Sequence, residues 1–322
     1  MKYNRLGKTG LKVSELSFGS WITFGKQTDL ISAGKLMKNA FDNGINFFDN
    51  AEAYARGLSE LIMGEILRTF RREELVISAK IFWGGEGPNQ TGLSRKHLLE
   101  GTKNSLRRMQ MEYVDLLFCH RPDPETPLEE TILAMDALVR GGEALYWGTS
   151  EWSAADLEKT FQLCRELSAI PPSMEQPQYN MLVRKRFEEE YKPLFEQYHM
   201  GTTTWSPLAS GVLTGKYNDG IPDDSRLARN PALRKTMEEA GLLSEETLSK
   251  VRRLSSLAGD LGGSMAQLAI AWILKNPHVS SVITGATSEE QLSENLGALE
   301  IKEKLDREFM KTIENILTRE EK

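Results

Sequence analysis

The sequence predicts an α/β protein built as a closed (β/α)8 barrel, with an N-terminal β-hairpin and extra C-terminal helices. Short apolar runs that suit buried strands alternate eight times with segments that carry apolar residues at helical spacing. Strict alternation requires a parallel sheet with its helices outside. The length of 322 residues suits a barrel with enlarged loops, because about 250 residues is typical. We therefore expect a single domain over residues 1–322.

The N-terminal segment, residues 2–18, carries short alternating runs around two glycines, which predict a hairpin that closes the bottom of the barrel. The first strand is expected at 16–19. The first helix is expected at 30–43, where the apolar residues have helical spacing and Asn43-Gly44 provides a stop signal.

The remaining strand–helix pairs follow the same pattern, and we expect a final outer helix at 306–317. The connection at 209–241 is long for a compact domain, which favours a functional loop. The expected strands are 46–49, 75–80, 114–119, 144–148, 173–176, 202–205 and 280–284. The expected helices are 58–70, 94–108, 127–139, 154–167, 184–198, 244–261, 265–275 and 289–296.

Composition limits the partners and the location. A net charge of −6 gives no electrostatic argument for nucleic acid or an anionic membrane. Residues 1–18 lack the apolar segment of a signal peptide, and the short apolar stretch at 265–274 suits a buried helix, so no membrane insertion is expected. Two cysteines, Cys119 and Cys164, fit a reducing cytoplasm. A homo-oligomer is compatible with this composition, which does not determine the oligomeric state.

Four polar residues lie at or just after the ends of successive strands: Asp49, Tyr54, Lys80 and His120. In a parallel barrel these strand ends surround one mouth. Each residue also has a simpler interpretation. Asp49 could cap a helix, Tyr54 could cover the core edge, Lys80 could be a solvated strand end, and His120 could be a core histidine. Their occurrence together at neighbouring strand ends favours a reactive site.

These side chains have a specific chemistry. A tyrosine with a reference pKa of about 10 keeps its proton near neutral pH. An ammonium about 4 Å away would interact with a developing phenolate by roughly 4 kcal/mol at an effective dielectric of about 20, so we expect Lys80 to lower the pKa of Tyr54. Asp49 would hold Lys80, and His120 would orient a substrate oxygen. The set forms a general acid for a carbonyl oxygen, without a nucleophile or metal cage, so an external hydride donor is expected.

The order of these four residues resembles the catalytic tetrad of the aldo-keto reductase superfamily. Further stretches resemble the branch that contains the voltage-gated potassium channel β-subunits and their bacterial relatives, and the likeness covers nearly the whole chain. Mammalian members of that branch carry Asn where this chain has His120, which is the commoner choice among active reductases. The stretches are Trp21-Ile22-Thr23-Phe24-Gly25, Lys80-Ile81-Phe82-Trp83-Gly84-Gly85, Arg121-Pro122-Asp123-Pro124, Tyr146-Trp147-Gly148-Thr149-Ser150 and Trp205-Ser206-Pro207-Leu208-Ala209.

The resemblance implies NADPH/NADP+ bound across the barrel mouth without a Rossmann domain. The sequence contains no G-x-G-x-x-G, and residues 211–217 are one residue short of a P-loop. By resemblance, Ser150 and Gln176 would bind the carboxamide and Trp205 or a neighbouring aromatic would pack on the nicotinamide. Ser20, Trp21, Gln27 and Asp49 would lie near the reacting end, Ser206, Pro207, Leu208 and Ser210 along the pyrophosphate, Lys216 and Arg226 at the 2′-phosphate, and Gly285, Thr287, Gln291, Glu294 and Asn295 at the adenosine.

Some of these positions have simpler interpretations. Gln291 and Glu294 could form the solvated face of a short helix, and Ser210 could be an ordinary turn residue. Glu151 stands where the channel subunits carry Arg beside the cofactor, so that contact is not carried over.

The resemblance implies an enzyme, an NADPH-dependent oxidoreductase acting on CH-OH groups. Its substrate would be a small carbonyl compound: an aldehyde, ketone or quinone. Tyr54 would give the proton. The expected substrate-binding residues are Trp21, Tyr54, Phe82, Trp83 and His120, although large aromatics at a barrel rim often serve packing alone.

Two other functions remain open. One is an NADPH-binding regulatory subunit of a membrane or scaffold protein with slow turnover, against which His120 argues. The other is an isomerase or aldolase, but Lys80 could form a Schiff base only without its partner Asp49. The sequence does not name the physiological substrate.

Overall fold

The structure is a computed structural model, and it describes residues 1–21, 24–25 and 29–318. Eight strands form a closed barrel in which each strand pairs in parallel with its neighbours and β10 closes the ring against β3. The predicted (β/α)8 barrel is confirmed. The barrel strands are β3 (Leu16–Gly19), β4 (Phe47–Asp49), β5 (Val76–Ile81), β6 (Val114–Cys119), β7 (Ala144–Ser150), β8 (Met174–Gln176), β9 (Gly201–Thr204) and β10 (Ser281–Thr284).

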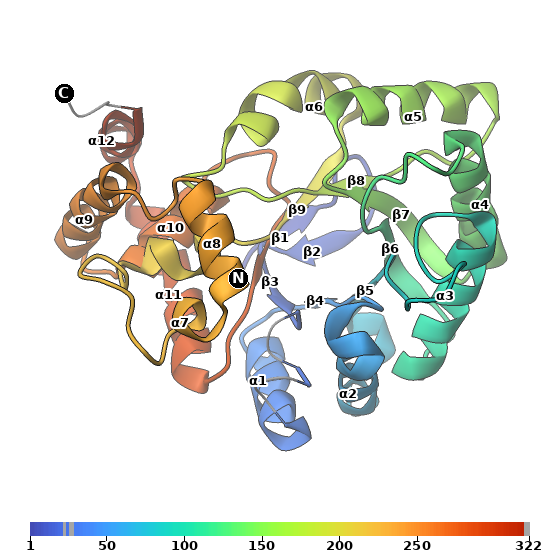
Figure 1. The fold of residues 1–322 in the computed structure, drawn as a ribbon, viewed down its shortest axis with the longest axis horizontal. Coiled ribbons are helices and arrows are strands. Elements are labelled where there is room, and N and C mark those ends of the chain that lie inside the picture. The colour runs from blue at the N-terminus through green and yellow to red at the C-terminus, as the bar shows by residue number, and fades with distance from the viewer. Residues whose placement is uncertain (22–23, 26–28, 319–322) are drawn as a thin grey trace. The chain divides into compact units, whose positions relative to one another are not determined.

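The barrel strands are apolar because both of their faces are covered. Every residue of β5 and β6 is buried, as expected for parallel strands between a packed interior and an outer layer of helices. Figure 1 shows α2 to α5 outside these strands. The helices of this layer are α1 (Leu30–Asp42), α2 (Leu58–Leu67), α3 (Arg95–Met109), α4 (Leu128–Gly141), α5 (Ala154–Glu166) and α6 (Lys192–Tyr198).

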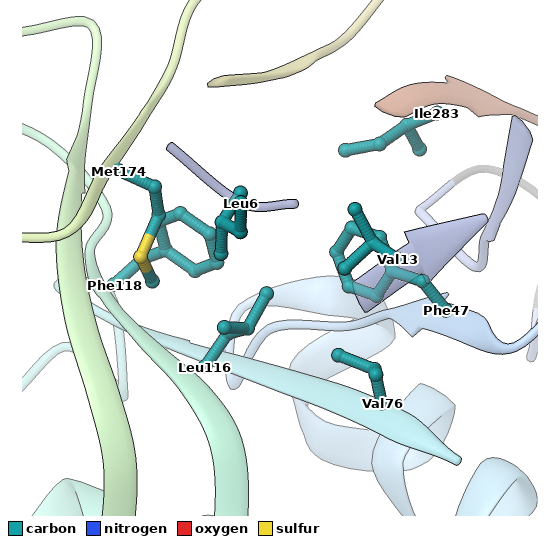
Figure 2. Close-up of a cluster of buried hydrophobic side chains, with 8 residues drawn as sticks. All are labelled: Leu6, Val13, Phe47, Val76, Leu116, Phe118, Met174 and Ile283. Atoms are coloured by element: carbon teal, nitrogen blue, oxygen red, sulfur yellow. The ribbon is translucent and has the colours of Figure 1, made fainter. Parts of the chain in front are cut away.

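The N-terminal hairpin closes one end of the barrel, as predicted. Its strands β1 (Tyr3–Arg5) and β2 (Lys12–Ser14) pair antiparallel. Leu6 and Val13 from this hairpin are fully buried in one cluster with inward-facing residues of the barrel strands, such as Phe47 and Leu116 (Figure 2). The Lys8 N–H donates to the carbonyl of His199, just before β9 begins. The hairpin therefore closes the end at which the strands start, and the mouth at their carboxyl ends stays available for a site.

The chain divides into two compact units. The first holds the barrel, in residues 1–177, 185–205 and 278–292, and the second holds residues 178–184, 206–277 and 293–322. The expectation of one domain stays a prediction. Elements of the second unit are η4 (Ala209–Thr214), α7 (Arg226–Arg229), α8 (Pro231–Glu239), α9 (Glu245–Asp260), α10 (Met265–Leu274), most of α11 (Glu289–Lys304) and α12 (Arg307–Thr318).

Helix α10 is almost wholly buried, as expected from its apolar sequence, and begins with a capping box between Ser264 and Gln267. No single helix in the described part of the chain is long and apolar enough to cross a membrane. Helices α9 and α10 together reach the required length and composition, but they are bent by 87° at their junction.

Three predictions were wrong: the structure of the connection at 209–241, the end of the helix at 289–296, and the single helix at 184–198. The connection at 209–241 contains α7 and α8, which Ser225 and Asn230 cap. Helix α11 continues to Lys304, because Leu292, Ala298 and Ile301 keep one buried face beyond Leu296.

The segment expected as one helix at 184–198 divides into a π-helical turn, Arg186–Glu190, and α6. Pro193 in the first turn of α6 has no N–H with which to continue the preceding helix.

Candidate functional site

A buried ion pair stands at the centre of the predicted site. Asp49 ends β4, and Lys80 lies near the end of the neighbouring strand β5. The Lys80 Nζ lies 2.6 Å from Asp49 Oδ2, and the two side chains are 0% and 3% exposed. Two charges buried this deeply persist only when they are paired and hydrogen-bonded. Strand pairing therefore brings together two residues that the sequence placed at adjacent strand ends.

The ammonium of Lys80 uses all three of its donors. Besides Asp49, it donates to the Asn50 carbonyl at 2.9 Å and to the Tyr54 hydroxyl at 2.9 Å. An ammonium has three N–H groups, so no donor is left over. Lys80 is thus held in one position, with a hydrogen bond aimed at the phenol oxygen.

The second oxygen of Asp49 is held by two residues that were not predicted for that role. Ser78 Oγ donates to Asp49 Oδ1 at 2.7 Å, and Gln176 Nε2 donates to the same atom at 3.1 Å. Ser78 lies two residues before Lys80, and alternation along a strand places both on one face, which is the signal that could have identified it. Gln176, expected at the carboxamide, also donates to Thr203 Oγ1 at 3.2 Å and so links β4, β8 and β9.

Tyr54 reaches Lys80 from a strained turn. It begins the 3-10 turn η1 (Tyr54–Gly57), and the next two residues, Ala55 and Arg56, have φ of 48° and 54°. Non-glycine residues in this left-handed region cost free energy and cluster at functional sites. The turn brings the phenol into a site where Tyr54 is only 8% exposed.

The electrostatics of Tyr54 correct one expectation. Burial raises the pKa of Tyr54 well above 10, the charge of Asp49 raises it further, and Arg121 opposes the shift. The expected lowering of the Tyr54 pKa by Lys80 is therefore wrong, because loss of solvation together with the charge of Asp49 outweighs the opposing charge of Arg121. Burial likewise lowers the pKa of Lys80, with Asp49 opposing. Tyr54 consequently keeps its proton near neutral pH.

His120 follows β6 directly and faces Tyr54, with 5.8 Å between the ring centroids. Burial lowers the pKa of His120 well below 6.5, and the positive charges of Lys80 and Arg121 lower it further. The imidazole is thus neutral near pH 7 and has one N–H to donate. Its Nδ1 is buried and has no hydrogen-bond partner among the described residues. An unpaired buried polar atom of this kind suits a ligand contact.

Aromatic side chains surround the two rings. Trp21 and Trp83 are 43% and 41% exposed, unusually high for tryptophan. The Trp21 ring lies 6.3 Å from that of Tyr54, and the Trp83 ring lies 5.0 Å from that of His120. Phe82 packs on Trp83 at 4.8 Å. The predicted apolar residues therefore lie together beside the polar group.

A buried glutamate, Glu52, supports the aromatic residues Phe82 and Trp83. This role was not predicted from the sequence. Glu52 Oε1 accepts from the backbone N–H of Phe82 at 2.7 Å and lies 3.0 Å from His97 Nε2. Both side chains are nearly inaccessible. The sequence offered no clear signal, because a glutamate between Asp49 and Tyr54 looks like an ordinary loop residue.

Comparison with known proteins agrees with this geometry. A model described as "Aldo/keto reductase family" matches residues 15–318. The chain belongs to this family.

Similar curated proteins include two named "Probable voltage-gated potassium channel subunit beta". The Arabidopsis thaliana protein is 53% identical over 304 residues, covering 94% of this chain and 92% of the relative. The Oryza sativa protein is 50% identical over 320 residues, covering 98% and 97%. A Schizosaccharomyces pombe protein, "Putative voltage-gated potassium channel subunit beta", is 46% identical over 321 residues, covering 97% and 92%. The predicted resemblance is confirmed.

In the barrel unit of this aldo/keto reductase, two predicted cofactor contacts adjoin the polar set. Ser20 donates to the Asp49 carbonyl at 3.0 Å, and Ser150 Oγ donates to the Gln176 carbonyl at 2.9 Å. Gln27 lies outside the described residues. After β10, Gly285 is exposed, and Thr287 donates to Gln291 through its N–H and hydroxyl at 2.8 and 3.0 Å.

Glu151 has a role in the barrel unit. Its Oε1 accepts from Trp205 Nε1 at 2.9 Å, and its Oε2 pairs with Arg186 at 2.5 Å. Trp205 in turn packs edge-on against Trp21 at 5.9 Å. Glu151 therefore holds the aromatic side chain that was expected to pack on the nicotinamide.

The second unit carries the other predicted contacts. Ser206, Ala209 and Ser210 have positive φ, as does Gly211. Backbone in this conformation can turn N–H groups toward an anion. The N–H groups of Ala209 and Gly211 donate to the carbonyls of Ser206 and Leu208, at 3.1 and 2.8 Å. Pro207 and Leu208 lie between Ser206 and Ala209 in the chain, and Leu208 has a φ of −103°. Glu294 is exposed on α11, and Asn295 is buried.

Two predicted cations lie near Tyr217 in the second unit. The Lys216 Nζ lies 5.1 Å from the Tyr217 ring, and the Tyr217 hydroxyl is buried and has no partner among the described residues. Burial lowers the pKa of Arg226, with Tyr217 opposing. Cations and a phenol of this kind fit a phosphate. No group of three or more His, Cys, Asp or Glu in the described ranges could hold a metal ion.

Proposed function

We propose that this aldo/keto reductase catalyses the NADPH-dependent reduction of aldehydes, ketones or quinones. The observation that carries the proposal is the buried Lys80, which donates at once to Asp49 and to the Tyr54 phenol. A phenol that keeps its proton in the resting state and accepts a hydrogen bond from a lysine can act as a general acid. A purely structural ion pair would not need Tyr54 held by a strained turn.

The residues act together on a carbonyl oxygen. NADPH, when bound, would supply the hydride for the carbonyl carbon. Tyr54 gives its proton to the oxygen, whose charge grows during the transfer, and the Lys80 hydrogen bond stabilises the phenolate that remains. Neutral His120 donates a hydrogen bond to the same oxygen and orients it. Trp21, Phe82 and Trp83 hold the apolar part of the substrate and exclude water.

The proposed cofactor contacts keep the division made from the sequence. Lys216 and Arg226 would bind the 2′-phosphate, and the segment from Ser206 to Gly211, where four residues have positive φ, would bind the pyrophosphate. Ser150 would bind the carboxamide. Gln176 would also bind the carboxamide, in addition to the hydrogen bond that it donates to Asp49. Cys119 and Cys164 are free thiols, which supports a cytoplasmic location.

The test is a panel of aldehydes, ketones and quinones with NADPH, followed by the loss of cofactor absorbance. Tyr54→Phe should lower aldehyde turnover by about 10²-fold or more, the usual scale of general acid catalysis, while the NADPH dissociation constant stays the same. Near-normal aldehyde turnover in that variant contradicts the assignment. Quinones test it less sharply, because they accept hydride with less help from a proton donor.

A second candidate is an NADPH-binding regulatory subunit with slow turnover. Relatives at 46–53% identity that are named as potassium channel β-subunits favour it. His120→Asn separates the two functions, because the channel-type Asn should cost the reductase its aldehyde activity without changing NADPH affinity. Slow turnover of every carbonyl by the wild type, no effect of His120→Asn and a stable complex with a membrane protein would together support the regulatory function.

A further inference from the structure

Arg121 is the next residue after His120 and is fixed beside it. Its Nη1 donates to the His120 carbonyl at 2.6 Å and to Ser150 Oγ at 3.3 Å. Its guanidinium carbon lies 5.4 Å from the centre of the Trp83 ring, a cation–π contact. These three contacts hold a half-buried positive charge at the edge of the proposed site.

This charge has no acid to balance it. No carboxylate among the described residues forms an ion pair with Arg121, in contrast to Lys80, which Asp49 neutralises. The acids close to it in the chain are engaged elsewhere. Asp123 accepts from the Leu93 N–H at 2.7 Å and from the Thr126 hydroxyl at 2.7 Å, and Glu151 pairs with Arg186.

Two of the three guanidinium nitrogens of Arg121 make no hydrogen bond to the described residues. Nη1 makes both protein hydrogen bonds, whereas Nε and Nη2 have no hydrogen-bond partner within the described ranges. These two nitrogens form the fork that binds a carboxylate through two parallel hydrogen bonds. The charge also acts on the reacting groups, since Arg121 opposes the rise in the pKa of Tyr54 and lowers the pKa of His120.

We propose that Arg121 determines specificity by binding a carboxylate on the substrate, so that the preferred substrates are aromatic aldehydes that carry an acidic group. The exposed faces of Trp83 and Trp21 would hold the planar body of such a molecule. This inference rests on the proposed reductase function, but it concerns a residue outside the Asp49, Tyr54, Lys80 and His120 set.

The kinetic test compares the three isomers of carboxybenzaldehyde with their methyl esters, which keep the shape and remove the charge. The ratio of kcat/KM for acid to ester should exceed one for at least one isomer. Arg121→Met should lower that ratio by about tenfold or more, as expected for loss of a charge-assisted hydrogen bond. Arg121→Lys should restore it only in part, because an ammonium does not form the two-pronged contact. Taking the ratio cancels any shared effect through Ser150.

Arg165→Met is the matched control. Arg165 is exposed in the last turn of α5 and also stacks on an aromatic ring, that of Tyr198 at 6.0 Å. It removes the same charge and the same kind of contact away from the mouth, so the ratio should stay at the wild-type value. An unchanged ratio in Arg121→Met for all three isomers, or an equal fall in Arg165→Met, overturns the proposal.

A binding measurement separates this inference from the reductase function. Benzoate and benzamide are titrated against tryptophan fluorescence, to which Trp83 and Trp21 contribute. Arg121→Met should weaken benzoate about tenfold or more and benzamide much less, and Arg121→Gln repeats the test if the Met variant folds poorly. If no carbonyl is reduced, the reductase function fails and this titration alone decides the role of Arg121. Equal weakening of both ligands, or none, refutes the role.

Discussion

Two groups of charged side chains, one in each unit, are balanced in different ways. In the barrel unit, the buried Lys80 has Asp49 as its counterion, and every donor of its ammonium is used. In the second unit, Lys216 lies beside Tyr217, whose buried hydroxyl has no partner among the described residues, and burial lowers the pKa of Arg226. The first group is complete within the protein, whereas for the second we propose an anionic ligand.

The difference determines which measurement should respond to each group. A charge pair that is complete in the fold contributes to both stability and catalysis, so its removal should be seen without any ligand. A cationic group that fits a phosphate should affect ligand affinity and leave the fold nearly unchanged.

Lys80→Met should have the largest effect. It leaves Asp49 buried without its counterion, which typically costs about 3–5 kcal/mol of stability, and it removes the group that stabilises the Tyr54 phenolate, for a further loss of about 10²–10⁴-fold in aldehyde turnover. Denaturant unfolding and the carbonyl assay measure the two effects. The double variant Lys80→Met with Asp49→Asn should recover part of the stability and none of the turnover. A single variant as stable as the wild type would show that the pair is not what holds this mouth.

Arg226→Ala tests the second group and should act on affinity alone. Loss of a charge-assisted contact with the 2′-phosphate should raise the NADPH dissociation constant by roughly ten- to a hundredfold, while NADH binding barely changes. Added salt should also reduce the wild-type preference for NADPH, since part of it is screened charge.

The control for that prediction is Arg229→Ala, which removes an exposed arginine from the same short helix, α7. Cofactor titration measures both variants. Equal losses for NADPH and NADH in Arg226→Ala, or the same loss in Arg229→Ala, would contradict the phosphate assignment.

Glu175 provides a comparison with Asp49 inside the barrel unit. Both carboxylates are buried, but within the described part of the chain Glu175 has no lysine as counterion. Thr149 donates a short hydrogen bond to it, and the Trp152 N–H donates at 3.3 Å. Burial raises the pKa of Glu175 to about 8, against about 4.3 in an unfolded chain. Between these values the folded state binds the additional proton, so the contribution of Glu175 to stability is largest at low pH and falls as pH rises.

Glu175→Gln should remove this dependence, whose slope is at most about 1.4 kcal/mol per pH unit. The measurement is the free energy of unfolding of the wild type and the variant across the window from about pH 5 to about 8. Glu300→Gln, an exposed carboxylate on α11, serves as the control. Parallel pH curves for wild type and Glu175→Gln would show that Glu175 is not protonated in the fold.

The fold and the centre of the site were predictable from sequence for one physical reason. Parallel strands buried on both faces must be apolar, so polar residues at their ends, such as Asp49, Lys80 and His120, are conspicuous. The alternation of strands and helices then places those ends around one mouth. In the same way, the hairpin of residues 2–18 was predictable from its local turn signals.

Other contacts in the site depend on how the barrel strands align and close, which local sequence patterns do not reveal. Gln176 reaches Asp49 across 127 residues of chain, and only the closed barrel makes them neighbours. Helices α7 and α8 were missed because their short length gives little periodicity, while their caps Ser225 and Asn230 resemble ordinary loop residues.

The sequence by itself determined the barrel and the identity of the four polar residues at its mouth, because both follow from local pattern and from the order of the strands. Only the tertiary structure decided the charge states. The pKa of Tyr54 is raised and not lowered, because loss of solvation is a property of the packed site and outweighs the opposing charge of Arg121. The same holds for Arg121, whose unbalanced charge is visible only once every nearby acid has been placed with another partner.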